Sequence, residues 1–124
     1  MGSEQALQFA AVALGGAIGA ALRYGIYQVS PAGPVSWGTF AANFIGCFLI
    51  CFIFFKFANI SDIAGLLLFT GILGGFTTMS SVSLEMVQFF DSAMFGRAAL
   101  VFIMNAGVCL GAGFIGRWSA LLIA

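Results

Sequence analysis

The sequence contains no histidine and only two prolines, and its charged residues are four basic and four acidic in a chain of 124. The lack of histidine excludes catalysis and metal binding by imidazole groups. Four scattered basic residues cannot form the clustered face that binds a phosphate backbone, which excludes a nucleic-acid partner. Charged residues make up 6% of the chain, against about 25% in an average soluble domain. They are too few to cover a soluble surface.

Apolar side chains fill the rest of the chain, which is 62% hydrophobic with a mean hydropathy of +1.14. A membrane-spanning helix needs about 20 mostly apolar residues, and four segments meet that requirement: 6–27, 37–58, 63–90 and 98–122. Both prolines fall between the first two segments, and Ser61 is placed to cap the third. The sequence therefore predicts an all-α membrane protein, a single domain of four transmembrane helices over residues 1–124.

The basic residues give no preferred orientation in the membrane. With four spans, both termini lie on the same side as the 59–62 loop. Lys56 and Arg117 flank that side, and Arg23 and Arg97 flank the other. An even division gives no bias under the positive-inside rule, so we expect dual topology and an antiparallel homodimer, since four helices alone do not easily enclose a polar pathway. Cysteine labelling that finds a single orientation would contradict this expectation.

Small residues in the spans predict helix contacts. Two glycine pairs have the GxxxG spacing that lets helix backbones approach closely: Gly15 with Gly19, and Gly107 with Gly111. The three cysteines lie in apolar runs without other soft ligands besides methionines, so we interpret them as packing residues rather than a metal site: Cys47, Cys51 and Cys109.

The third span contains the stretch GGFTTMSSVS, residues 74–83, in which five of ten side chains carry hydroxyl groups. Glycine is a poor helix former, so the Gly74–Gly75 pair predicts a break near the middle of the span. A broken backbone leaves carbonyls that bind a cation. The alternative is a straight helix in which the hydroxyl groups bond back to the preceding turn. Thr77, Ser81 and Glu85 share one face, and this polar stripe suits a small ion that loses its water.

Three further polar residues stand out in apolar surroundings. Asn43 and Asn105 each either hold helices together or line a pathway, and the sequence alone does not choose between these roles. Arg23 lies near the end of the first span, where it either extends to the membrane surface or takes part in a site.

Three motifs in the same order carry a resemblance to a known family. They are GGAIGAALRY at 15–24, WGTFAANFIG at 37–46 and GILGGFTTMSSVSLE at 71–85. Together with the chain length, they resemble those of the Fluc/CrcB fluoride channels over nearly the whole sequence. The resemblance implies an antiparallel dual-topology homodimer in the plasma membrane (the inner membrane of a bacterium), with two pores for passive fluoride export from the cytoplasm.

The resemblance also implies roles for individual residues. Backbone carbonyls of the broken third helix, from Gly74 and Thr77, would hold a central structural Na⁺. Arg23 would lie at the pore vestibule, and Glu85 would be the acid of the third motif. The remaining matched positions would line the fluoride pore: Asn43, Thr39, Ser80, Ser81, Met79 and Val82.

Met79 and Val82 depart from the family pattern, which has phenylalanines at both positions, where positive ring edges can face an anion. Three explanations remain open: fluoride conduction with an altered lining, a paralogous partner that supplies the aromatic rings, or a variant with reduced conduction or a changed ligand. Two other functions compete: a small multidrug-type cation transporter and a non-conducting subunit. Transporters of that type use a membrane-embedded glutamate in the first span, whereas the first span here has no acidic residue after Glu4, which lies outside it. An enzyme is not expected, because no nucleophile–base pair can be assembled.

Overall fold

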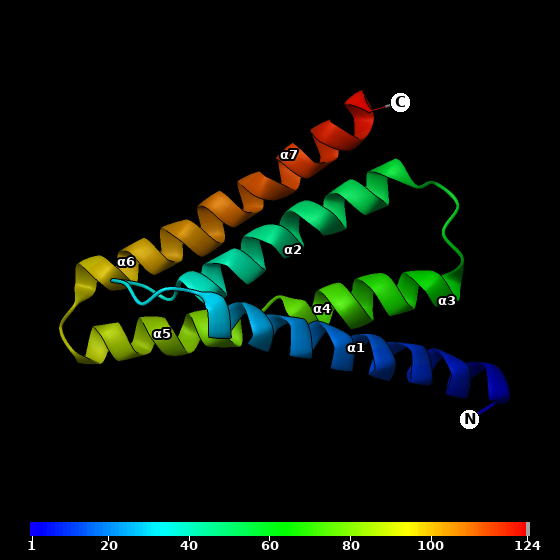
Figure 1. Ribbon diagram of the computed structural model, residues 1–124, viewed down its shortest axis with the longest axis horizontal. Helices are drawn as coiled ribbons and strands as arrows, with labels where there is room; N and C mark the ends of the chain where they lie inside the picture. The colour runs from blue at the N-terminus through cyan, green and yellow to red at the C-terminus, as the bar shows by residue number, and fades with distance from the viewer. Residues whose placement is uncertain (124) are drawn as a thin grey trace.

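The computed structural model describes residues 1–123, and this part of the chain consists of helices and their connections (Figure 1). Four stretches are long and apolar enough to cross a membrane, as predicted. The first is α1 (Ser3–Val29) and the second α2 (Trp37–Lys56). The third comprises α3 (Asp62–Gly65), the wide π-helical segment η1 (Leu66–Leu73), α4 (Gly74–Phe76) and α5 (Ser80–Asp91). The fourth comprises α6 (Phe95–Phe102), the π-helical η2 (Ile103–Val108) and α7 (Cys109–Leu122).

Successive spans run in opposite directions along the long axis of the molecule (Figure 1). Both termini lie at the same end as the connection between α2 and α3, and the α1–α2 loop lies at the other end with the turn between α5 and α6. Along the bundle, α2 packs against α7, α1 against η1 and α4, and α5 against α6. The predicted placement of the termini is therefore confirmed.

Short polar residues begin two of the spans. The Ser36 hydroxyl accepts a hydrogen bond from the Thr39 N–H at 3.3 Å, and the Ser61 hydroxyl accepts one from the Ala64 N–H at 3.3 Å. Each bond satisfies an N–H group that has no partner within its own helix. The predicted cap at Ser61 is confirmed.

The glycines of α1 permit a close contact with the third span, as predicted for Gly15 and Gly19. Both are buried. A Cβ atom on Gly15 would lie 2.9 Å from the Gly71 Cα, and one on Gly19 would lie 2.9 Å from the Phe76 backbone nitrogen. Because these neighbours are backbone atoms, a methyl group at either position would force the two helices apart.

The other predicted glycine contact is wrong within this chain. A Cβ atom on Gly107 or Gly111 would meet nothing within 4 Å. The fourth span instead packs through Gly113 and Gly116, where a Cβ would lie 3.2 Å from the Cys51 Sγ and 3.1 Å from the Phe48 carbonyl carbon. GxxxG spacing gives the pair a common face, but the position of α2 decides which face is used.

The three cysteines lie between α2 and α7. Cys47 and Cys51 are half-buried and Cys109 is buried. The Cys109 thiol points at the Phe40 carbonyl oxygen, 3.9 Å away. Their positions agree with packing roles.

Candidate functional site

The third span is interrupted at residues 77–79, within the stretch 74–83 but after the Gly74–Gly75 pair, where the break was expected and where both glycines are helical. Helical structure ends at Phe76, Thr77 has an extended backbone (φ −84°, ψ 156°), and α5 begins at Ser80. The Thr77 hydroxyl bonds back to the Leu73 carbonyl at 3.0 Å, as the straight-helix alternative requires of a hydroxyl group. The ladder nevertheless stops one residue later, because the Thr78 N–H donates across the bundle to α2.

Asn43 of α2 holds the interruption open. Its side-chain oxygen accepts the Thr78 N–H at 2.7 Å, and its amide nitrogen donates to the Thr78 carbonyl at 3.0 Å. The same nitrogen donates to the Asn105 oxygen at 2.9 Å, and the Asn105 nitrogen donates to the Val101 carbonyl at 3.0 Å. Both amides are buried. They therefore join the second, third and fourth spans through groups that hydrocarbon could not solvate.

The interruption leaves carbonyl groups outside the helical ladder. Because the Thr78 N–H bonds to Asn43, it does not reach the Gly74 carbonyl four residues earlier. Within residues 1–123, no hydrogen bond outside the helices ends on the carbonyl oxygen of Gly74 or of Thr77. Carbonyl oxygen atoms are suitable ligands for a hard cation such as Na⁺. The two carbonyl groups therefore fit the cation that the sequence resemblance implied.

Hydroxyl groups from three spans form a chain beside the interruption. The Ser36 hydroxyl donates to the Thr39 hydroxyl at 2.9 Å, and Thr39 donates to the Tyr27 hydroxyl at 3.5 Å. The Tyr27 hydroxyl donates to Ser81 at 3.4 Å. Thr78 continues the chain, with its hydroxyl 3.1 Å from those of both Ser81 and Ser80. These groups can rotate and donate in either direction along the chain.

One end of this chain opens into a cavity of about 480 Å³ with polar and apolar walls beside the α1–α2 loop. Glu85 and Tyr27 line it together with residues of the loop and of the first turn of α2. The Glu85 carboxylate accepts the Ser36 N–H at 2.6 Å. The structure therefore connects Glu85 to the hydroxyl chain through Ser36.

Arg23 points toward the interruption and not along the membrane surface. Its Nε donates to the Gly75 carbonyl at 3.1 Å, and its guanidinium carbon lies 6.0 Å from the centre of the Tyr27 ring. The side chain is only partly exposed. Arg23 thus contacts backbone at the end of α4, next to the ring that carries part of the hydroxyl chain.

Met79 lies at the end of the interruption and Val82 in the first turn of α5. Met79 is 69% exposed, whereas Val82 is 3% exposed and packs with Val35 and Val101. Both border a mostly apolar hollow of about 440 Å³ that Asn105 also lines. The hollow opens on the surface of the chain. A side chain at position 79 is therefore exposed to the lipid or to a neighbouring protein chain.

The structure brings most of the predicted site residues into one network. Thr39, Ser80, Ser81 and Glu85 belong to the hydroxyl chain and its cavity, and Asn43 adjoins that chain through Thr78. Sequence reasoning missed Tyr27. Its only signal was its position one turn after Arg23, on the same face of the first span.

Comparison with known proteins agrees with this arrangement. A family model described as "CrcB-like protein, Camphor Resistance (CrcB)" matches residues 10–117. The chain belongs to the CrcB family. The match spans every residue of the network described above, from Arg23 to Asn105.

Similar members of the CrcB family are named fluoride-specific ion channel FluC. One from Agrobacterium fabrum is 41% identical over 116 residues, which cover 89% of this chain and 93% of the relative. One from Rhizobium etli is 40% identical over 119 residues, with the same coverage. One from Acidithiobacillus ferrooxidans is 33% identical over 116 residues, again with 89% and 93% covered.

Proposed function

We propose that this CrcB-family chain is a passive, fluoride-selective channel that exports fluoride from the cytoplasm across the cell membrane. The observation that carries the proposal is the chain of hydroxyl groups from three spans, in a protein 41% identical to a fluoride-specific channel. Fluoride is a small anion that leaves water only where other hydrogen-bond donors replace its hydration shell. Hydroxyl and amide groups supply such donors without a fixed charge that would trap the ion. The relatives' names describe channels and no enzyme.

The pore is proposed to form between two antiparallel copies, or between this chain and a paralogous partner. Met79 and Ser80 are exposed beside the interruption, so one chain alone does not surround an ion at this depth. A second chain against this face would enclose the path. The equal division of basic residues between the two ends supports insertion in both directions.

A Na⁺ ion is proposed to be held by the carbonyl oxygens of Gly74 and Thr77. The exposed backbone of Gly74 supports a position at the surface of one chain, where a two-fold partner would double the two oxygens to four. A cation bound there would supply fixed positive charge that stabilises the opened backbone of both third spans. The bond between Asn43 and the Thr78 N–H supports this assignment, because it leaves the Gly74 carbonyl without that helical partner.

Within the pore, we propose that Thr39, Ser80 and Ser81 donate hydrogen bonds to the moving ion. Asn43 would border the path and hold its backbone open, because both of its amide N–H groups already donate to Thr78 and Asn105. Arg23 and Glu85 would act at the vestibule, where Glu85 lines the cavity beside the α1–α2 loop. Met79 and Val82 would border the path at the 440 Å³ hollow.

A non-conducting or partner-dependent subunit is the second candidate. The observation that favours it is that Met79 and Val82 place a thioether and methyl groups where the resemblance calls for aromatic rings. Neither offers the positive ring edge that can face an anion.

The test is fluoride release from liposomes loaded with potassium fluoride, with the membrane potential clamped by a potassium ionophore. We expect release of fluoride and none of chloride. Ser80→Ala should slow release at least tenfold, since the loss of one hydrogen-bond donor to the ion raises its barrier by about 1.4 kcal/mol or more. Asn43→Ala should also slow release, because this side chain holds open the interruption beside the path. Ser92→Ala, in the exposed turn after α5, is the matched hydroxyl control and should leave release unchanged.

The outcomes separate the candidates. No release by folded chain alone would refute the channel as a property of this chain by itself, and release restored by a co-reconstituted paralogue would establish the partner-dependent subunit. Uptake of an organic cation driven by a proton gradient would establish a multidrug-type transporter. Unchanged fluoride release in both Ser80→Ala and Asn43→Ala would refute the residue assignments. Met79→Phe should raise the rate if ring edges are what the lining lacks.

A further inference from the structure

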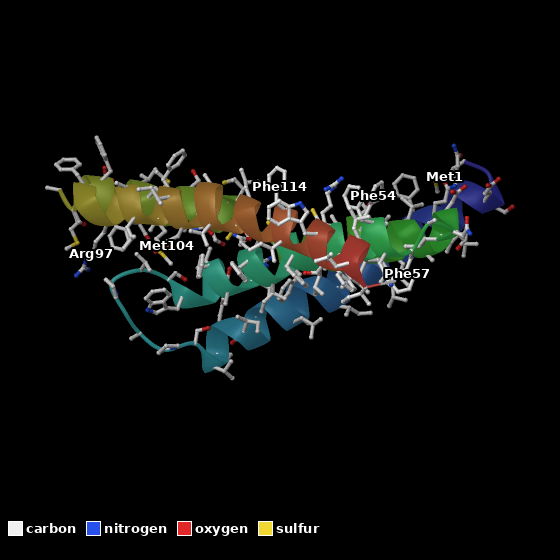
Figure 2. The ribbon with its side chains drawn as sticks, turned by 90° about the horizontal axis from the view of Figure 1, so that it is seen from above. Met1, Phe54, Phe57, Arg97, Met104 and Phe114 are labelled. Atoms are coloured by element: carbon white, nitrogen blue, oxygen red, sulfur yellow. The ribbon has the colours of Figure 1, made fainter. Side chains whose placement is uncertain are left out.

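We propose that a hollow between the end of α2 and the start of the third span binds an amphipathic organic cation. The hollow has a volume of about 660 Å³, within the range of small-molecule sites. Its walls include Phe54, Phe57 and Phe69, with the acidic residue Asp62 among them. It lies at the end of the bundle that carries both termini (Figure 1), where Figure 2 shows Phe54 and Phe57 at the same end as Met1.

The aromatic rings form walls set at an angle to one another. The ring centres of Phe54 and Phe69 lie 6.1 Å apart with their planes at 59°. Phe55 contacts Phe54 in an edge-to-face arrangement, with centres 5.2 Å apart and planes at 76°. Phe54 remains 62% exposed and Phe57 55% exposed. Aromatic rings that line a hollow attract a cation that lies over one of their faces.

Asp62 gives the hollow a negative charge that the helix start does not require. Ser61 already caps α3 through the Ala64 N–H. Among residues 1–123, no lysine or arginine lines the hollow. The basic residue closest in sequence, Lys56, donates to the Ile123 carbonyl beside α7. Rings and one carboxylate without a basic partner form the chemical environment that recognises organic ammonium and phosphonium ions.

The same lining argues for a free cation over a phospholipid headgroup. A zwitterionic headgroup would bring its phosphate next to Asp62, and no cationic side chain of the lining could pair with it. The volume also exceeds what a bare ammonium group would fill, which favours a cation with apolar substituents. This site lies at the opposite end of the bundle from the Glu85 cavity beside the α1–α2 loop, so the inference does not rest on the proposed fluoride path.

The test is equilibrium dialysis of radiolabelled tetraphenylphosphonium against the full chain in detergent micelles. Tetraphenylborate, an anion of almost the same shape, measures purely hydrophobic partitioning. We expect saturable binding of the phosphonium at one site per chain. Asp62→Asn and Phe69→Leu should each weaken it about two- to fivefold, the size expected for cation contacts that water still reaches.

The opposite end of the chain provides a matched control. Asp91 is exposed there and follows Phe90, whose ring packs against Phe95 with centres 5.1 Å apart, but none of the three lines the proposed hollow. Asp91→Asn should therefore leave phosphonium binding unchanged. Non-saturable binding, equal affinity for tetraphenylborate, or equal weakening by Asp91→Asn and Asp62→Asn would overturn the proposal. Circular dichroism establishes that each variant has folded.

Discussion

Replacing Asn43 with alanine tests whether one side chain maintains the interruption of the third span. The substitution removes three hydrogen bonds, two to the backbone of Thr78 and one to Asn105. Hydrogen bonds that side chains make between helices within membranes contribute on average about 0.6 and at most about 1.7 kcal/mol each. Three of them predict a loss of about 2 to 5 kcal/mol in the free energy of unfolding.

The lower part of that range applies if the third helix repairs itself. Without Asn43, the Thr78 N–H is free to bond to the Gly74 carbonyl four residues earlier, which would continue the helical ladder through the interruption. The Asn105 oxygen would still lose its donor. Hydrogen exchange at the Thr78 amide therefore distinguishes a repaired helix, in which the amide stays protected, from an open one, in which it exchanges quickly.

The assay is reversible unfolding in mixed micelles of increasing SDS fraction, followed by tryptophan fluorescence at fixed protein concentration. Gln88→Ala removes an exposed amide from α5 and should change stability by less than about 0.5 kcal/mol. In a double-mutant cycle, Asn43→Ala and Asn105→Ala should show a coupling of about 0.6 kcal/mol. A loss below 0.5 kcal/mol for Asn43→Ala would refute the reasoning.

Two further predictions concern backbone geometry. Gly15→Ala should destabilise the chain by about 1 to 3 kcal/mol, since its Cβ would lie only 2.9 Å from the Gly71 Cα. Gly16→Ala is the control, because its Cβ would meet nothing within 4 Å, and it should be neutral or slightly stabilising in the same SDS titration. Equal losses of stability in the two variants would contradict the packing argument. Ala93 has a left-handed backbone (φ 57°) in the turn after α5. Ala93→Gly should therefore stabilise by about 1 kcal/mol, a prediction that an unchanged or lower SDS midpoint would contradict.

The positions of the spans followed from the sequence because hydrocarbon imposes them. A segment in the membrane must satisfy its own backbone and present apolar side chains, so length and hydropathy locate it without knowledge of its neighbours. The expected span 63–90 lies within the observed helices from Asp62 to Asp91. An interruption in this stretch was also visible, because glycines followed by a run of hydroxyl residues weaken a helix through local preferences. Its position was not, since Gly74 and Gly75 are helical and the break follows at Thr77.

The partners of the polar groups depended on which spans are neighbours. Nothing local to Asn43 indicated that it would bond to both backbone groups of Thr78, 35 residues away. Tyr27 looked like an ordinary residue at a span's end until folding placed its hydroxyl between those of Thr39 and Ser81. The outward face of Gly107 likewise reflects where α2 lies and not the glycine spacing.

By itself, the sequence determined an all-helical membrane protein with four spans and a weak point in the third, because these depend on local composition and on the solvent. Only the tertiary structure decided that Asn43 holds the weak point open and that hydroxyl groups from three spans meet beside it. The physical reason is that a buried hydrogen bond needs two groups within about 3 Å. That distance arises from the packing of helices far apart in the chain.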